Sequence, residues 1–329
     1  MAFAVNFFVR RILQGLIIVV LVALLIFALL RIVPGDPVRI ILGPMATASV
    51  MEETAQKLGL RDPIPVQFGR FATDVVKGDF GRSYIRGLQG GSSSGSQDAA
   101  VLETASRAPV IQLIMNALPY SLMLGGLGIF FALLVALPIG IYAGLKSGSW
   151  PDRVALYISS LFVSLPNIWV GVVLIFLISA KLGWLPAIGY KGFSYAVLPA
   201  IVLAIEISPI MIRAISVSVA TAVGQSYVDV GVIRGLPYST VVRRHVLRNA
   251  SIPLLNLFGA QLIGILLGSI FVIEYIFSYP GVGLLTINAV FQRDFPIIQA
   301  VAILASGALV TINMLVDFTS TSIDRRLKF

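Results

Sequence analysis

The sequence predicts an all-α, polytopic membrane protein with six transmembrane helices, and three observations carry this prediction. Of the 329 residues, 57% are hydrophobic and only 12% are charged, whereas a soluble domain is typically about 25% charged. Apolar runs of the length that crosses a bilayer, about 20 residues, recur along the chain. The 24 Lys and Arg residues outnumber the 15 Asp and Glu residues, and this surplus gathers on alternate loops, as the positive-inside rule describes.

Six apolar segments are expected to span the membrane, at residues 12–30, 121–142, 155–180, 195–212, 252–277 and 297–316. The first of them follows Arg10 and Arg11 and in this respect is similar to a signal peptide. It is 19 residues long, however, and the RIVPGDP sequence after it offers no small-residue cleavage site. A retained first helix is therefore expected.

The distribution of basic residues predicts that both termini lie in the cytoplasm. In that orientation the cytoplasmic pieces are residues 1–11, 144–153, 213–251 and the tail after 317, with 12 basic and 3 acidic residues. The opposite side carries a net charge of only +3. The inverted orientation would place the cluster of Arg243, Arg244 and Arg248 outside, against the positive-inside rule.

Composition also excludes several classes of function. The chain has no cysteine and a single histidine, His245, so we expect no disulfide and no metal site. It contains no G-x-x-x-x-G-K-[ST] loop for ATP and no serine placed with a base for nucleophilic work. We therefore expect neither enzymatic activity nor a cofactor in this chain. Its low charge density argues against nucleic acid as a partner.

Three regions are expected: residues 1–33 with the first helix, an extracytoplasmic segment at 34–108, and a core at 109–329 with the other five helices. In the second region, LGLRDPIPVQF predicts an extended turn and GRFATDVVKGDFGRSY a short helix ending at Gly78. The Gly/Ser-rich tract 87–98 has two interpretations, a flexible spacer or a mobile arm that contacts an external partner. Residues 109–120 are expected to form an interfacial helix before the second span.

The cytoplasmic stretch 213–251 predicts an elbow of two short helices. Gly235 can adopt a positive φ and end the first helix, and Pro237 fits the first turn of a second one. Basic residues follow at positions 243, 244, 245 and 248, and Pro253 is expected to open the fifth span. Such a cationic elbow suits docking to another protein or to anionic lipid.

Glu206 lies in the middle of the fourth span. A carboxylate at this depth is costly and is expected to face a bundle interior or a water-filled cavity. Three interpretations remain open: a residue of a translocation path, a structural partner for a neighbouring subunit, or an interfacial residue. Glu274 and Asp317 lie near span ends, where interfacial capping or hydration explains them.

The segment FSYPGVG, residues 277–283, is expected to turn back at the outer surface, because Pro280, Gly281 and Gly283 disfavour a continuous helix. One interpretation is that this turn shapes an outer gate and belongs to a translocation path.

The elbow resembles the EAA loop of the membrane permeases of ABC importers, and the rest of the chain resembles the dipeptide/oligopeptide branch of that family. Asp229-Val230-Gly231 corresponds to the acid-and-small-residue turn, with Asp229 in place of the usual Glu or Arg and Val230 in place of Ala. Gly235 and Pro253 match the fixed glycine and the downstream proline. Other matching pieces are PGDP at 34–37, LGLRDPIPVQF with GDFGRSY, the run RRHVLRNASIP, EYIFSYPGVG, QRDFPIIQ and the tail VDFTSTSIDRRLKF. The Gly/Ser tract looks like an insertion, and Arg325 stands where the family usually has Pro.

The resemblance implies a binding-protein-dependent ABC importer permease (MetI-like) fold in the bacterial inner membrane. It implies a second permease half, two ATPase subunits that bind ATP and Mg²⁺, and an extracytoplasmic solute-binding protein, beside membrane lipid. The implied solutes are di- and oligopeptides, with nickel complexes, glutathione or sugars as alternatives; a self-sufficient secondary transporter is the distant alternative. The residues implied to dock the ATPase are Tyr227, Asp229, Gly231, Arg234, Gly235, Leu236, Pro237, Arg243, Arg244, His245, Arg248 and Pro253.

Overall fold

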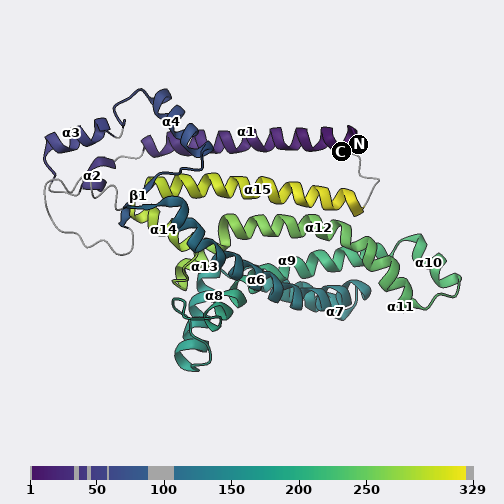
Figure 1. Cartoon of the computed structure of the whole chain (residues 1–329). Coiled ribbons are helices and arrows are strands. Elements are labelled where there is room, and N and C mark those ends of the chain that lie inside the picture. The colour runs from purple at the N-terminus through teal and green to yellow at the C-terminus, as the bar shows by residue number, and fades with distance from the viewer. Residues whose placement is uncertain (1, 33–36, 43–45, 58, 88–106, 324–329) are drawn as a thin grey trace. The chain divides into compact units, whose positions relative to one another are not determined.

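A computed structural model describes residues 2–32, 37–42, 46–57, 59–87 and 107–323, and most of these are helical (Figure 1). Three segments discussed above lie wholly or partly outside the described residues. They are PGDP at 34–37 except for Pro37, the Gly/Ser tract 87–98 except for residue 87, and the last six residues of the tail. The chain divides into two compact units. Residues 1–119 and 285–308 form the N-terminal unit, and residues 120–284 and 309–329 form the core unit.

The N-terminal unit contains the first apolar helix and the segment after it. Its elements are α1 (Ala2–Ile32), α2 (Pro37–Leu42), α3 (Ala48–Lys57), α4 (Ile64–Val76), and the antiparallel strands β1 (Arg82–Gly87) and β2 (Arg107–Pro109). The prediction of an extended turn over 58–68 is wrong in its second half, because α4 already begins at Ile64. Pro63 caps this helix and a second proline lies in its first turn, where a missing N–H costs nothing.

A buried carboxylate joins β1 to the connection between α14 (Val282–Gln292) and α15 (Phe295–Ile323). Asp294 has no solvent exposure; it accepts a hydrogen bond from the backbone N–H of Tyr84 at 3.0 Å and another from the Ser83 hydroxyl. A buried charge is stable only when it is hydrogen-bonded in this way. Asp294 therefore fixes the strand against the start of α15.

Helices occur at all six predicted span positions. Four segments in the described part of the chain are long and apolar enough to cross a membrane, namely Arg10–Ile32, Val110–Leu145, Ser194–Val223 and Phe295–Thr319. They correspond to the first, second, fourth and sixth predicted spans. The second differs at its start, because α6 (Val110–Leu145) is one helix. The interfacial helix predicted at 109–120 is not a separate element: Pro109 ends β2, and the remaining residues form the first part of α6.

The third predicted span is bent and is not a single straight helix. It consists of α7 (Trp150–Val163), followed by α8 (Asn167–Leu174) and the π-helical segment η1 (Ile175–Lys181), with a 91° bend between the two parts. The cause is Pro166, which lacks an N–H and disfavours helical backbone at the residue before it. Pro166 has ψ 133° and caps α8 instead of continuing α7.

The fifth predicted span belongs to a longer stretch that is helical without a break from Tyr238 to Ile276. It comprises α11 (Tyr238–Val241), η2 (Val242–Val246), α12 (Leu247–Gly264), η3 (Ile265–Ser269) and α13 (Ile270–Ile276), of which η2 and η3 are π-helical. Pro253 lies inside α12, so the prediction that it opens this helix is wrong. A proline inside a helix removes one backbone hydrogen bond, here to the carbonyl of Asn249.

The helix α9 (Ser194–Val223) is the centre of the core unit, with more than half of its residues buried. Glycines on α6 allow the two backbones to approach closely. A Cβ at Gly140 would lie 2.7 Å from the Cβ of Ile215, and one at Gly144 would lie 2.6 Å from the carbonyl oxygen of Ser216. Small residues spaced four apart are a common basis of helix packing in membranes.

Candidate functional site

The predicted elbow follows α9 and consists of α10 (Ser226–Ile233), a bend, and α11. Gly235 has φ +79°, the left-handed conformation that favours glycine. The N–H of Leu236 donates to the carbonyl of Gly231 at 3.2 Å, and the N–H of Gly235 donates to the carbonyl of Val232 at 2.9 Å. This pair of bonds is the Schellman motif. The structure therefore confirms the predicted bend at Gly235 and the new helix after Pro237.

The inner side of the elbow is packed and holds the angle between α10 and α11. Val228, Gly231, Val241 and Val246 are buried. A Cβ at Gly231 would lie only 3.2 Å from the Cγ2 of Val241, so the absence of a side chain at Gly231 lets the two helices meet. The two helices consequently form one rigid corner.

The outer side of the elbow exposes both apolar and basic side chains. Ile233 is 83% exposed and Tyr238 is 52% exposed, although such residues are usually covered in a finished assembly. The basic side chains of Arg234, Arg243, Arg244, His245 and Arg248 are exposed as well. Figure 1 shows α10 and α11 projecting from the core unit beyond the ends of α9 and α12. A projecting apolar surface beside basic side chains is typical of a docking site for another protein.

The predicted docking residues do not all play the same part in the structure. Those from Asp229 to Pro237 lie in the elbow, Arg243, Arg244 and His245 lie in the π-helical segment η2 that continues α11, and Arg248 lies in the first turn of α12. Tyr227 is half-buried and donates a hydrogen bond to the carbonyl of Ala222 at 3.1 Å; it joins α10 to α9. Pro253 lies further along α12, beyond the elbow. Their role in docking stays a prediction.

A second site surrounds Glu274, whose side chain has no solvent exposure. Its Oε1 accepts a hydrogen bond from the Ser121 hydroxyl at 2.6 Å, and its Oε2 accepts from the N–H groups of Gly283 at 2.7 Å and Leu284 at 3.1 Å. The Ser121 oxygen also accepts from the N–H of Val282 at 2.8 Å. Glu274 and Ser121 thus satisfy the first three N–H groups of α14, where a negative charge is also favoured by the helix dipole.

This arrangement confirms capping as the explanation of Glu274 but not interfacial hydration, because the carboxylate is dry. Sequence reasoning missed Ser121, which lies 153 positions from Glu274 and carries no local signal of a partner. It also missed the role of Asp294, which lies 211 positions from its partner Ser83.

The turn between α13 and α14 is built closely around that carboxylate. A Cβ at Gly281 would lie 2.1 Å from Glu274 Oε1, and one at Gly283 would lie 2.5 Å from the Cα of Phe271. Tyr279 is fully buried, with its ring centroid 5.5 Å from that of Tyr190. The glycines are therefore needed for packing, and Pro280 lies in a closely packed turn. A gating role for this turn stays a prediction.

Glu206 is half-buried on α9 and accepts a hydrogen bond from the Ser269 hydroxyl of η3 at 2.6 Å. Within the described part of the chain, its other oxygen is buried and has no hydrogen-bond partner. A carboxylate that keeps unused acceptor capacity in an apolar helix is typical of a functional position in a membrane protein. Its place in a translocation path stays a prediction.

Comparison with known proteins identifies the class to which this multi-pass core with a projecting elbow belongs. Residues 136–329 match the family described as "binding-protein-dependent transport system inner membrane component". Residues 4–125 match the corresponding N-terminal family. The chain belongs to this family and is a permease subunit of an ABC importer.

Similar proteins agree along almost the whole length. The "Glutathione transport system permease protein GsiC" of Salmonella paratyphi A is 33% identical over 98% of this chain and 99% of that protein. The "Probable peptide ABC transporter permease protein y4tP" of Sinorhizobium fredii is 30% identical over 98% of this chain and 99% of that protein.

Solved structures confirm the predicted MetI-like fold. The inward-facing MetNI methionine ABC transporter has a TM-score of 0.56 at 17% identity, over 65% of this chain and 97% of that chain. An amino acid ABC transporter crystallised with histidines has a TM-score of 0.51 at 18% identity, over 71% of this chain and 100% of that chain. At this identity the likeness concerns the fold.

Proposed function

We propose that this permease forms one half of the translocation path of an importer for short peptides, with a second, related permease as the other half. ATP and Mg²⁺ bind to two separate ATPase subunits, which dock on the elbows of the two permeases. A solute-binding protein delivers the solute from the extracytoplasmic side, and both termini of this chain lie in the cytoplasm. The observation that carries the proposal is the elbow, because it exposes apolar side chains on a rigid corner.

The packing of the elbow suggests how it would transmit motion. A force on the exposed side of α10 passes to α11 through the contact of Gly231 with Val241, and to α9 through the hydrogen bond of Tyr227. Because α9 is the most buried helix of the core unit, a displacement of the elbow moves the helices packed on it. Closure of two ATPase subunits would in this way reorient the two permease halves.

Peptides are the favoured solutes because the two relatives are named for glutathione and for peptides, and glutathione is itself a tripeptide. Nickel complexes and sugars are the alternatives. The Glu206 carboxylate supports an amino-bearing solute, since it offers an acceptor that a passing ammonium group can use.

Uptake by the purified complex tests this function. We expect proteoliposomes that contain the permease pair, the ATPase subunits and the solute-binding protein to accumulate labelled glutathione or dialanine when ATP is inside. Accumulation should stop when a non-hydrolysable ATP analogue replaces ATP, because the chain has no energy source of its own. Uptake that continues without hydrolysis, or that follows an ion gradient, would instead show a secondary transporter.

A further inference from the structure

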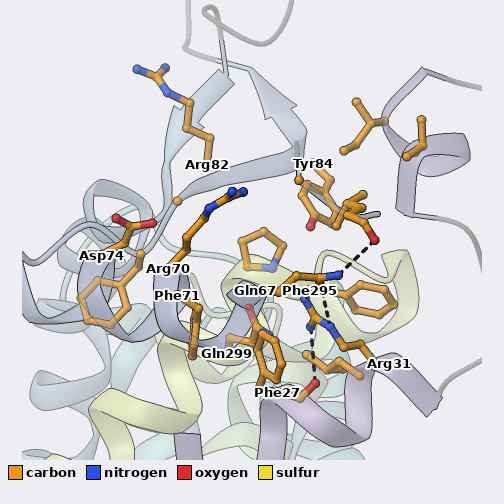
Figure 2. A pocket seen from close by; sticks show the side chains of 18 of the residues that line it. Phe27, Arg31, Gln67, Arg70, Phe71, Asp74, Arg82, Tyr84, Phe295 and Gln299 are labelled. Carbon is orange, nitrogen blue, oxygen red and sulfur yellow. Dashed lines mark hydrogen bonds between the residues drawn. The ribbon is translucent and has the colours of Figure 1, made fainter. Parts of the chain in front are cut away.

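The N-terminal unit contains a cavity of about 800 Å³ to which the function proposed above assigns no role (Figure 2). Its floor is formed by the end of α1 and the beginning of α15, and its walls come from α4, β1 and β2. Every one of its lining residues belongs to this unit and to the described part of the chain.

The lining combines an apolar floor with a cationic wall. Phe27 and Leu30 of α1, Phe71 of α4 and Phe295 of α15 supply apolar surface. The charged lining residues are five arginines and two aspartates, namely Arg31, Arg61, Arg70, Arg82 and Arg107 with Asp74 and Asp79. The cavity is therefore shaped for a molecule that is apolar in one part and negatively charged in another.

Two of the arginines have only neutral hydrogen-bond partners among the described residues. Arg31 donates to the side-chain oxygen of Gln67 at 2.5 and 3.2 Å, and its guanidinium lies 3.6 Å from the ring centroid of Phe27, as Figure 2 shows. Arg107 donates to the carbonyl of Ile41 at 2.8 Å. By contrast, Arg70 is paired with Asp62 at 2.7 Å. The charges of Arg31 and Arg107 are consequently not neutralised by the described part of the protein.

Tyr84 lies near both of these arginines. Burial and the charge of Asp294 raise the pKa of Tyr84 to about 12, and the positive charges of Arg31 and Arg107 only partly oppose this rise. The phenol therefore keeps its proton at neutral pH and is a hydrogen-bond donor. Two guanidinium groups and a phenol are a suitable donor set for a phosphate group.

The position of the cavity on the chain indicates where such a phosphate comes from. The first spanning segment ends at Ile32 and the last begins at Phe295, so the floor of the cavity lies where two membrane spans leave the hydrocarbon. Leu29 is 48% exposed and Ile32 is 77% exposed at the end of α1, which gives an apolar surface next to Arg31. Lipid headgroups occupy this level of the membrane.

We propose that this cavity binds the headgroup of an anionic phospholipid such as phosphatidylglycerol. Arg31 and Arg107 bind the phosphate diester, and the acyl chains lie along the exposed Leu29 and Ile32. In the proposed orientation the lipid belongs to the outer leaflet. The site depends on the membrane-spanning character of the chain and not on its solute.

Native mass spectrometry of the detergent-purified importer complex tests this site. We expect the wild-type complex to bind phosphatidylglycerol about tenfold more tightly than phosphatidylcholine. The double variant Arg31→Gln with Arg107→Gln should lose at least this tenfold preference, because two charge-assisted hydrogen bonds are removed. Lys77→Gln is the matched control, since Lys77 is an exposed basic residue of the same unit that does not line the cavity.

A second variant keeps the test decisive if the double glutamine variant folds poorly. Arg31→Lys with Arg107→Lys retains both charges and should still prefer phosphatidylglycerol to phosphatidylcholine. The proposal is overturned if a correctly assembled glutamine variant binds the lipid as Lys77→Gln does, or if the lysine variant shows no preference. It is also overturned if glycerol 3-phosphate, glutathione or dialanine binds as tightly as the lipid, because the cavity would then be a site for soluble anions or for the solute.

Discussion

Replacing Gly235 by tryptophan should abolish solute uptake, by more than about 100-fold, while the protein still inserts into the membrane. At φ +79°, any residue with a Cβ is strained by roughly 1–2 kcal/mol. Nothing lies within 4 Å of a Cβ placed there, so the indole would project outward over the proposed docking surface. Uptake by proteoliposomes and recovery of the ATPase with the purified permease measure the two effects.

The chain offers a matched control for this substitution. Gly148 has φ +77°, is exposed, and also has nothing within 4 Å of an added Cβ, but it lies between α6 and α7, outside the elbow. Gly148→Trp should retain most of the uptake, and Gly235→Ala, which adds strain without bulk, should lie between the two. If Gly235→Trp imports solute as Gly148→Trp does, the elbow is not the docking site.

Replacing Glu274 by alanine should destabilise the core unit by about 3 kcal/mol, because three hydrogen bonds to a buried carboxylate are lost and the N–H groups of Gly283 and Leu284 remain without acceptors. The unfolding midpoint of the detergent-purified permease, followed by tryptophan fluorescence, should fall clearly. Uptake should fall with it, since the turn that ends α13 and begins α14 is no longer fixed.

Ser121→Ala should cost less, about 1–2 kcal/mol, since Glu274 keeps two of its three hydrogen bonds. The double variant should cost less than the sum of the single ones, because both residues belong to one hydrogen-bond network. Ser159→Ala is the control: this hydroxyl is buried and has no partner among the described residues, so its removal should change stability little. The capping role would be contradicted if the unfolding midpoint of Glu274→Ala were the same as that of Ser159→Ala.

Sequence periodicity and apolar length predicted the class of fold, the approximate positions of the apolar helices and the bend at Gly235, because these depend on local chemistry. A positive φ is favoured by glycine wherever it occurs, and the apolar runs need no partner to be recognised. The family followed from motifs that agree in order along the chain. The comparisons confirm it.

Features that depend on residues far apart in sequence were not predictable. The pairing of Glu274 with Ser121 and that of Asp294 with Tyr84 join positions separated by more than 150 residues, and no periodicity records them. Local competition explains other differences: Pro166 bends the third span by 91°, whereas Pro253 is accommodated inside α12. The presence of a proline alone does not predict whether a helix bends or continues, because the outcome depends on the helices packed around it.

Site-specific photo-crosslinking tests the central claim, that the elbow docks an ATPase, most directly. A photoreactive amino acid in place of Ile233, which is 83% exposed on the elbow, should form a covalent link to an ATP-binding subunit in intact cells. The same amino acid in place of Trp184, which is 72% exposed but lies outside the elbow, should not. Crosslinks to the ATPase from position 184 but not from position 233 would contradict the account.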